Sequence, residues 1–370
     1  MTLSLPEFLR KMPKAELHYH LLGGVRMQTM LDLAHKYAVP LTEKDAKSYY
    51  RAFAHENEVV KGGIAALNFL YPLLRSTEDY ERVAFEILED AKNSGVRYVE
   101  FFWNPNDIAP ELSYQSVTLA LAKIFAQAER DWNISAYLIP SINREKSPEE
   151  AVEMVQWMID FPHDRVLGIG IDYREDHAPI EKFWKAYRLA KQHGLRLTGH
   201  CSEFGLHWRN VETGLDLIGL ERIDHGYTVV ENPALMTRCA EEGIPFTVVP
   251  SNTFFLKKWP DHKTWQHRHP IRQMARAGMT IIPATDDWHM HNTNGQKCYQ
   301  VMIEDFGFDL DGIRQCIENG INAAWQPEST KKIWRKEWLA EFDRLRATLI
   351  EEPLFTKEFH TPYQLAKSIK

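Results

Sequence analysis

The chain has 370 residues, 44% of them hydrophobic and 12% aromatic, which is enough to bury a large core. Its formal net charge of −7 argues against nucleic acid or anionic lipid as a partner, because such partners need concentrated Lys and Arg. The four cysteines have no CxxC spacing, so neither a disulfide framework nor a thiolate zinc site is indicated. Charged residues interrupt the apolar stretch near the amino terminus and no segment is long enough to span a bilayer, so we expect a soluble, cytoplasmic protein.

Eight short apolar runs, rich in β-branched residues, alternate along the chain with longer amphipathic stretches. They span residues 15–20, 98–102, 134–139, 166–172, 195–200, 222–225, 246–250 and 280–286. The interval between the fourth and fifth runs holds one helical pattern, with Phe183, Ala186, Tyr187 and Ala190 on one face and Gly194 as a carboxy-terminal cap. Strands that alternate with helices predict an α/β fold with a parallel sheet, and eight such units predict a (β/α)8 TIM barrel.

The first two runs are separated by about 75 residues, too many for a single crossover. Much of this interval, from residue 37 to residue 92, has helical periodicity. We therefore expect a helical lid inserted after the first strand, at about residues 22–96. Because the sequence has no internal repeat, low-complexity tract or Gly/Ser linker, we expect residues 1–370 to form one barrel domain.

Two histidines close the first run. His18 and His20 lie on the same face of an extended strand, because the side-chain period of a strand is two, and there they could share a metal ion. With 16 histidines in the chain, one His-x-His pair is expected by chance, and two more occur at 267/269 and 289/291. The pair alone is therefore weak evidence for a metal site.

Polar and ionisable residues also follow several later runs. His200 ends the fifth run, Asp224, His225 and Gly226 the sixth, residues 250–252 the seventh, and Asp286 with Asp287 the eighth. Each has an ordinary structural explanation, since a strand-end histidine is usually satisfied by hydrogen bonds and an Asp pair often caps a helix. In a (β/α)8 barrel, however, the carboxyl ends of all strands converge on one mouth, where active sites are built. The pattern therefore predicts an active site at that mouth.

Four of these segments resemble, in the same order, the motifs of the adenosine deaminase family. Residues 13–21 read PKAELHYHL and look like the family's opening PKAELHxHL. Residues 198–203 read TGHCSE and resemble its HAGE motif, residues 222–226 its RIxHG motif, and residues 285–287 its TDD motif. The resemblance covers nearly the whole chain, and four motifs in the right order are a specific signal.

The resemblance implies one zinc ion, bound by His18, His20, His200 and Asp286, with a position left open for water. Neutral imidazole and carboxylate suit zinc, and the cation lowers the pKa of bound water so that hydroxide forms near neutral pH. Asp286 would thus serve catalysis as well as metal binding.

By the same resemblance, three further residues act on the substrate. His225 would orient the water and help to take its proton. A protonated Glu203 would donate to the ring nitrogen next to the attacked carbon, and Asp287 would accept a hydrogen bond from the far side of the ring.

Two other metal arrangements do not match the sequence. Cytidine-type deaminases need H-x-E followed by P-C-x-x-C, and neither element occurs. The fourth run ends at Asp172 rather than at a lysine that could be carboxylated to bridge two metals. A single zinc ion is therefore expected.

Four departures from the family pattern lie near the expected pocket. Leu22 stands where relatives usually carry an acidic residue that contacts the sugar, and leucine cannot accept that hydrogen bond. Glu175 falls about where a family glycine lets the backbone approach the purine, while Phe102 replaces an arginine and Trp288 a proline. We therefore expect unmodified adenosine to be a poorer substrate than a free aminopurine or one with an apolar or modified group.

Aromatic residues near the same mouth could contact a flat ligand. Tyr173, Trp288 and His289 could stack on it or hydrogen-bond it, although ordinary packing at the barrel rim explains them equally well. His289 and His291 are weak candidates for a second metal site, because the sequence places no third donor near them. Their role stays open at this point.

The predicted function is zinc-dependent hydrolytic deamination of a small purine-like molecule, an aminopurine or a purine nucleoside, with release of ammonia. One alternative is a deaminase of a modified adenine or of another aminated heterocycle. A barrel amidohydrolase that cleaves a cyclic amide or lactone would not need a ring-protonating acid, so Glu203 argues against it. A relative that only binds a nucleoside or a metal would not need all of the predicted ligands. The sequence gives no oligomeric state.

Overall fold

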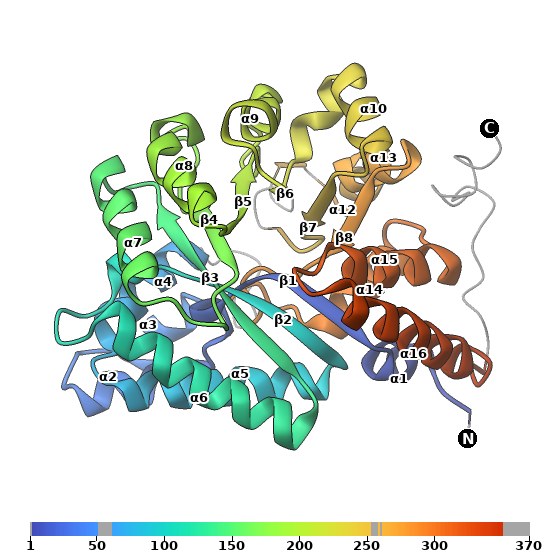
Figure 1. The fold of residues 1–370 in the computed structure, drawn as a ribbon. Coiled ribbons are helices and arrows are strands. Elements are labelled where there is room, and N and C mark those ends of the chain that lie inside the picture. Colours follow the sequence, from blue (N-terminus) through green and yellow to red (C-terminus); the bar gives the residue numbers. More distant parts are fainter. Residues whose placement is uncertain (1, 51–60, 253–257, 260, 351–370) are drawn as a thin grey trace.

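The computed structural model of the protein describes residues 2–50, 61–252, 258–259 and 261–350 (Figure 1). Its eight strands are hydrogen-bonded to one another in the order of the sequence, all in parallel. They are β1 (Lys14–His20), β2 (Val96–Trp103), β3 (Ser135–Asn143), β4 (Gly168–Asp172), β5 (Arg196–Cys201), β6 (Arg222–His225), β7 (Pro245–Val248) and β8 (Thr280–Pro283). The predicted (β/α)8 barrel is confirmed, with one observed strand for each predicted run.

The last strands are shorter than the sequence predicts. Val248 pairs with Pro283 as the final step of the β7–β8 ladder, after which both chains leave the sheet and enter the loops at its mouth. The barrel nevertheless closes beyond β8 through Asp286. His20 N donates to Asp286 O at 3.0 Å, and Asp286 N donates to His18 O at 3.1 Å. The two histidines of β1 and the aspartate after β8 are therefore held side by side by backbone hydrogen bonds.

Helices surround the strands (Figure 1). On the barrel and its carboxy-terminal side they are α1 (Leu5–Lys11), α6 (Tyr114–Trp132), α7 (Pro148–Asp160), α8 (Trp184–Gln192), α9 (Arg209–Thr213), α10 (Pro233–Glu241), α12 (His262–Arg268), α13 (Pro270–Arg276), α14 (Gly295–Glu304), α15 (Leu310–Ala323) and α16 (Glu328–Arg346). Single-turn segments add η4 (Pro105–Asp107), η5 (Ile180–Phe183), the π-helical η6 (Gly214–Ile218) and η7 (Tyr227–Glu231). Among the described residues, no helix has the length and apolar character needed to cross a membrane.

Local signals fix where these helices begin and end. Ser147 caps α7, its hydroxyl accepting from Glu150 N at 3.2 Å while the Glu150 carboxylate accepts from Ser147 N at 2.9 Å. Pro148 occupies the first helical position, where its missing N–H costs no hydrogen bond. The preceding helix α6 stops at Asn133, whose left-handed φ of 56° redirects the chain into β3.

The interval between β1 and β2 contains the predicted helical insertion. It holds η1 (Leu21–Gly24), α2 (Met27–Lys36), α3 (Glu43–Lys47), α4 (Gly63–Leu70), η3 (Tyr71–Leu73) and α5 (Thr77–Asn93), while residues 51–60 lie outside the described part. The last of these, α5, packs against β2 and α6 and so forms part of the barrel wall. The added helices therefore end before α5, earlier than the expected boundary at about residue 96.

Candidate active site

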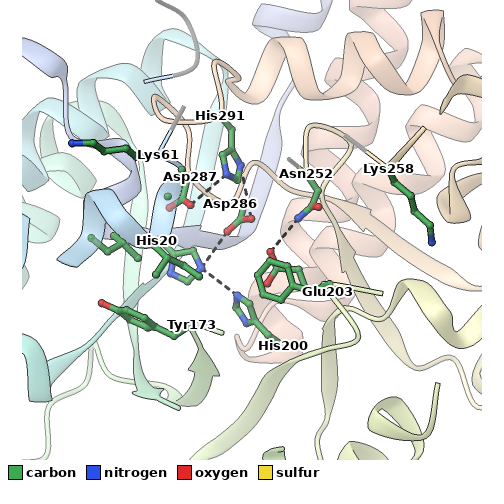
Figure 2. A pocket seen from close by; sticks show the side chains of 15 residues that line it. His20, Lys61, Tyr173, His200, Glu203, Asn252, Lys258, Asp286, Asp287 and His291 are labelled. Atoms are coloured by element: carbon green, nitrogen blue, oxygen red, sulfur yellow. Dashed lines mark hydrogen bonds and ion pairs between the residues drawn. The ribbon is translucent and has the colours of Figure 1, made fainter. Parts of the chain in front are cut away.

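The four expected metal ligands converge at the carboxyl ends of β1, β5 and β8. His18 and His20 share one face of β1, and His200 is the next-to-last residue of β5. His18 Nε2 lies 3.3 Å from Asp286 Oδ1, and His20 Nε2 lies 3.2 Å from the same oxygen. His20 Nε2 also lies 3.2 Å from His200 Nε2 (Figure 2). Three imidazoles and one carboxylate thus turn their donor atoms toward a common point.

The surroundings of His18 and His200 fit a metal ion. His18 Nδ1 is engaged with Thr247 Oγ1 at 3.0 Å, whereas His18 Nε2 is buried with no hydrogen-bond partner among the described residues. A buried polar atom without a partner is costly, and a cation at the convergence point would satisfy it. Burial and the neighbouring His18 lower the pKa of His200 to about 3, which keeps that imidazole neutral. Neutral imidazole and carboxylate are zinc ligands, so the set fits the cofactor that the sequence implies.

Carboxylates behind the histidines orient their rings. Asp224 Oδ1 lies 3.7 Å from His18 Nδ1, and its Oδ2 lies 3.6 Å from His200 Nδ1. Asp172 Oδ2 lies 3.5 Å from His20 Nδ1. Such carboxylate contacts fix the tautomer and orientation of metal-binding histidines. Both aspartates end strands in the sequence, yet only the folded structure shows that they face the imidazoles from behind.

Glu203 and His225 lie next to this cluster. The donor atoms of His18, His200, His225 and Asp286 all fall within 4.8 Å of one another. His225 Nε2 is 3.6 Å from Glu203 Oε2, and Asn252 Nδ2 donates to Glu203 Oε1 at 3.1 Å (Figure 2). Burial, together with the negative charge of Asp286, raises the pKa of Glu203 well above its usual value. Burial lowers the pKa of His225 well below its usual value, so the surroundings favour the neutral form of both side chains.

A cavity of about 460 Å³ opens onto these groups. It is lined by residues from the strand ends, the inserted helix α4 and the loop after β7: His20, Lys61, Gly62, Gly63, Ile64, Leu67, Tyr173, His200, Glu203, Phe204, Asn252, Lys258, Asp286, Asp287 and His291 (Figure 2). A half-open cleft with apolar walls and a few convergent polar groups is typical of a small-molecule site. The contribution of α4 and of Phe204 could not be predicted, because it depends on how the insertion folds back over the mouth.

Asp287 lies in this cavity in close contact with two glycines. A Cβ atom at Gly63 would lie 2.0 Å from Asp287 Oδ2, and one at Gly23 would lie 2.1 Å from Asp287 Oδ1. These distances are far below van der Waals contact, so only glycine leaves room for the carboxylate at either position. The insertion therefore shapes the cavity around Asp287.

His291 lies beside both carboxylates of the TDD motif. Its Nε2 is 3.5 Å from Asp287 Oδ2 and its Nδ1 is 3.9 Å from Asp286 Oδ2. The expectation that no third donor lies near His291 is wrong, since donor atoms of these three residues lie within 4.8 Å of one another. His289 is directed elsewhere, with its Nε2 2.9 Å from Asp90 Oδ2.

The structure places three of the expected substrate contacts outside the described cavity lining. Leu22 is fully buried, because η1 turns its side chain into the hydrophobic core. The Trp288 ring stacks on Tyr19, with ring centroids 5.2 Å apart. Glu175 is buried against backbone N–H groups. Tyr173 alone of the expected aromatic contacts lines the cavity.

Comparisons with known proteins find relatives that cover most of the chain. A family model described as adenosine deaminase matches residues 13–338. An amidohydrolase from Burkholderia ambifaria, solved with bound Zn, is 44% identical, with a TM-score of 0.89 and coverage of 93% of this chain and 94% of its own. An adenine deaminase from Cupriavidus necator is 28% identical over 95% of this chain and 97% of its own length. An adenosine deaminase from Clostridium kluyveri is 27% identical over 94% and 99%.

Proposed function

Because the chain belongs to the adenosine deaminase family, we propose that it is a zinc-dependent hydrolytic deaminase of an aminopurine that releases ammonia. The observation that carries the proposal is the convergence of three imidazoles and one carboxylate beside the partly buried carboxyl group of Glu203 in one cavity. This arrangement combines a metal centre with a proton donor.

Different residues at the site carry out different steps of the reaction. His18, His20, His200 and Asp286 would hold the zinc ion. When bound, zinc supplies the Lewis acidity that makes water a nucleophile near neutral pH. His225, which burial keeps neutral, accepts the proton that the attacking water gives up.

Glu203 and Asp287 act on the heterocycle. Glu203, which burial keeps protonated, gives its proton to the ring nitrogen as the carbon–oxygen bond forms at the adjacent carbon. The carbon–nitrogen bond then breaks, and the amine leaves as ammonia with the proton that His225 took from the water. The proton of the new hydroxyl group returns to Glu203 as the carbonyl of the product forms. Asp287 accepts a hydrogen bond from the opposite side of the ring and aligns it.

The described cavity favours a purine with few sugar hydroxyls. Its lining carboxylates are Glu203, Asp286 and Asp287, and each already has a task in metal binding, proton transfer or ring recognition. Ile64, Leu67 and other apolar side chains form much of the remaining wall. A free aminopurine, or one with an apolar or modified group, is therefore the substrate class we propose, in preference to unmodified adenosine.

An ammonia-release screen with zinc-loaded protein tests both the function and the substrate class. The compounds are adenine, adenosine, their N6-, 2- and 5′-substituted forms, guanine derivatives and pterins. We expect turnover of an aminopurine by zinc-loaded protein and none after chelation. Absence of ammonia release from every compound would refute the deaminase assignment. If adenosine were the best compound by about tenfold or more, the substrate class would be wrong while the deaminase assignment would stand.

The remaining expectations concern the partners of the protein and its location in the cell. A net charge of −7 supports a protein that acts on free small molecules rather than on nucleic acid or a membrane surface. With no disulfide framework suggested by its cysteines, a cytoplasmic location is part of the same proposal.

A further inference from the structure

Glu175 lies behind the wall of the cavity, in the loop that follows β4, and is 3% exposed. Its carboxylate accepts hydrogen bonds from the backbone N–H groups of Ser202 and Glu203, the second at 2.8 Å. The backbone N–H of Phe204 also hydrogen-bonds to it, and Asn210 Nδ2 donates to it at 3.2 Å. One carboxylate therefore meets three consecutive N–H groups of a single turn.

This turn follows β5 and has an uncommon backbone conformation. Ser202 has a φ of 61°, in the left-handed region that is unfavourable for a residue with a side chain. The turn brings its N–H groups together on one side, where they form a concave site for an anion. Buried N–H groups need an acceptor, and a carboxylate supplies a stronger one than a neutral group. The charge of Glu175 thus stabilises the conformation that the turn adopts.

Arg144 holds the loop of Glu175 against the same strand end. Its buried guanidinium donates to Asp172 O at 3.1 Å, to Ala178 O at 3.1 Å and to His200 O at 2.7 Å. These three bonds join the loop after β4 to the end of β5. The loop that carries Glu175 is therefore fixed relative to β5, and the hydrogen bonds of Glu175 fix the turn in the same position.

The side chain of Glu203 extends from this turn toward the cavity. Its two oxygens face Asn252 and His225 at 3.1 Å and 3.6 Å (Figure 2). We propose that Glu175 is a positioning residue, which fixes the turn at residues 202–204 and thereby sets the carboxyl group of Glu203 beside the substrate ring. Glu175 touches neither the metal ligands nor the described cavity, so its effect on the reaction passes through Glu203. The inference rests on the proposed deaminase function.

The substitution Glu175→Gln probes this role with little change in shape. It replaces one acceptor oxygen by an NH2 group, which would oppose the backbone N–H groups, and it removes the charge. A misplacement of a catalytic group by about 1 Å can lower the rate about 100-fold. We expect kcat to fall by about 10- to 100-fold. Zinc content should be unchanged, and KM should change by less than about threefold.

A control variant separates this effect from the loss of a hydrogen bond between a carboxylate and a backbone N–H in general. Glu150→Gln alters a carboxylate that likewise accepts from a backbone N–H, that of Ser147, but at the start of α7. It should leave kcat and KM unchanged. The best substrate from the ammonia screen serves for all variants, and zinc content is measured for each.

A double-mutant cycle with Glu203→Gln decides the inference. If Glu175 acts through Glu203, Glu175→Gln should lower the residual rate of the Glu203→Gln protein less than about threefold. The reason is that the carboxyl group that Glu175 positions is already absent from that protein. Equal and multiplicative losses in the two backgrounds would overturn the inference, as would an unchanged kcat in the single variant.

The same cycle can be run with Glu175→Asp if Glu175→Gln does not fold, since Asp keeps the charge but shortens the reach. The same coupling is expected, and its absence is again decisive. A wild-type protein with zinc but no activity in the screen would overturn the proposed function instead, so the two failures are distinguishable.

Discussion

The side chain of Glu203 is 12% exposed, and its burial together with the negative charge of Asp286 raises the pKa of its carboxyl group well above its usual value, which favours the protonated form. The variant Glu203→Gln keeps the shape of the side chain but cannot give up a proton. We expect it to fold and bind zinc normally while kcat falls by about 100- to 10,000-fold, the usual contribution of general acid–base catalysis. Steady-state kinetics together with metal analysis measures both. More than about a tenth of the wild-type kcat would assign the proton to another group.

His18 contributes a buried nitrogen that has no hydrogen-bond partner among the described residues. Removing this nitrogen in His18→Ala, or the shared carboxylate in Asp286→Ala, should lower the zinc content well below one per chain and abolish turnover. His289→Ala is the matched control, because this histidine contacts Asp90 and does not line the described cavity. It should keep its zinc. Full activity of zinc-free His18→Ala protein would contradict the ligand assignment.

At the scale of single elements, the strands end in an unusual way. Tyr173 after β4, Ser202 after β5, His225 at the end of β6 and Asp286 after β8 all have positive φ, between 61° and 67°. Such conformations cost residues with side chains about 1 to 3 kcal/mol each and persist where the surrounding structure over-determines them. All four occur at the mouth that holds the site. The strand ends thus turn sharply at this mouth, and two of these residues, Tyr173 and Asp286, line the cavity.

The inserted helix α4 contributes a second constraint, through Gly63 at its first position. In Gly63→Ala the new Cβ would lie 2.0 Å from Asp287 Oδ2, so the carboxylate must move. Alanine is the better helix former, so the helix itself should not be weakened. We expect kcat/KM to fall by about 10- to 150-fold, the loss of one hydrogen bond to a charged group, with zinc content unchanged.

The control for this prediction is Gly295→Ala at the start of α14. There the nearest atoms to an added Cβ lie 3.5 Å away, which is ordinary contact. This variant should have wild-type kinetics. If Gly63→Ala behaved in the same way, the carboxylate of Asp287 would have no fixed position in the cavity.

The comparison of these elements with the sequence shows what local patterns can predict. The runs that became β1 to β8 and the four motifs predicted the barrel and the residues at its strand ends, because period and position along a strand are local properties. Leu22, Glu175 and Trp288 were expected to contact the substrate from their place next to motifs. The side chain of Leu22 is instead buried in the core, that of Glu175 accepts hydrogen bonds from a backbone turn, and that of Trp288 stacks on the ring of Tyr19. Those directions depend on tertiary contacts that no spacing reveals.

At the scale of the whole molecule, the two ends of the barrel differ in their polar groups. The carboxyl end carries the proposed metal ligands, the proposed proton donor and the turns with positive φ. Away from that mouth, buried Arg222 at the amino end of β6 pairs with buried Glu100 midway along β2, with 2.7 Å between Nη1 and Oε2. Tyr98 Oη donates to Glu100 Oε1 at 2.6 Å, and Trp325 N donates to the same oxygen at 3.0 Å. In a barrel of this type, polar groups at the amino end serve stability and those at the carboxyl end serve function.

The substitution Glu100→Ala should therefore lower stability with little effect on catalysis. It would leave the Arg222 guanidinium buried without its carboxylate, and breaking a buried ion pair in this way typically costs about 3 to 5 kcal/mol. The partly exposed pair of Arg97 and Glu341, with Nη2 and Oε1 2.8 Å apart, provides the matched control. Glu341→Ala should cost only about 0 to 1 kcal/mol, because water screens the pair and replaces its hydrogen bonds.

Urea unfolding of the zinc-loaded proteins, with the slope of the transition compared between variants, measures both costs. We expect Glu100→Ala to retain zinc and KM, since Arg222 approaches the ligand-orienting Asp224 only to 3.9 Å. A loss of zinc without a loss of stability would mean that Glu100 acts on the metal centre through Arg222 and Asp224. A similar cost for Glu100→Ala and Glu341→Ala would mean that water or another group reaches the buried guanidinium and compensates its charge.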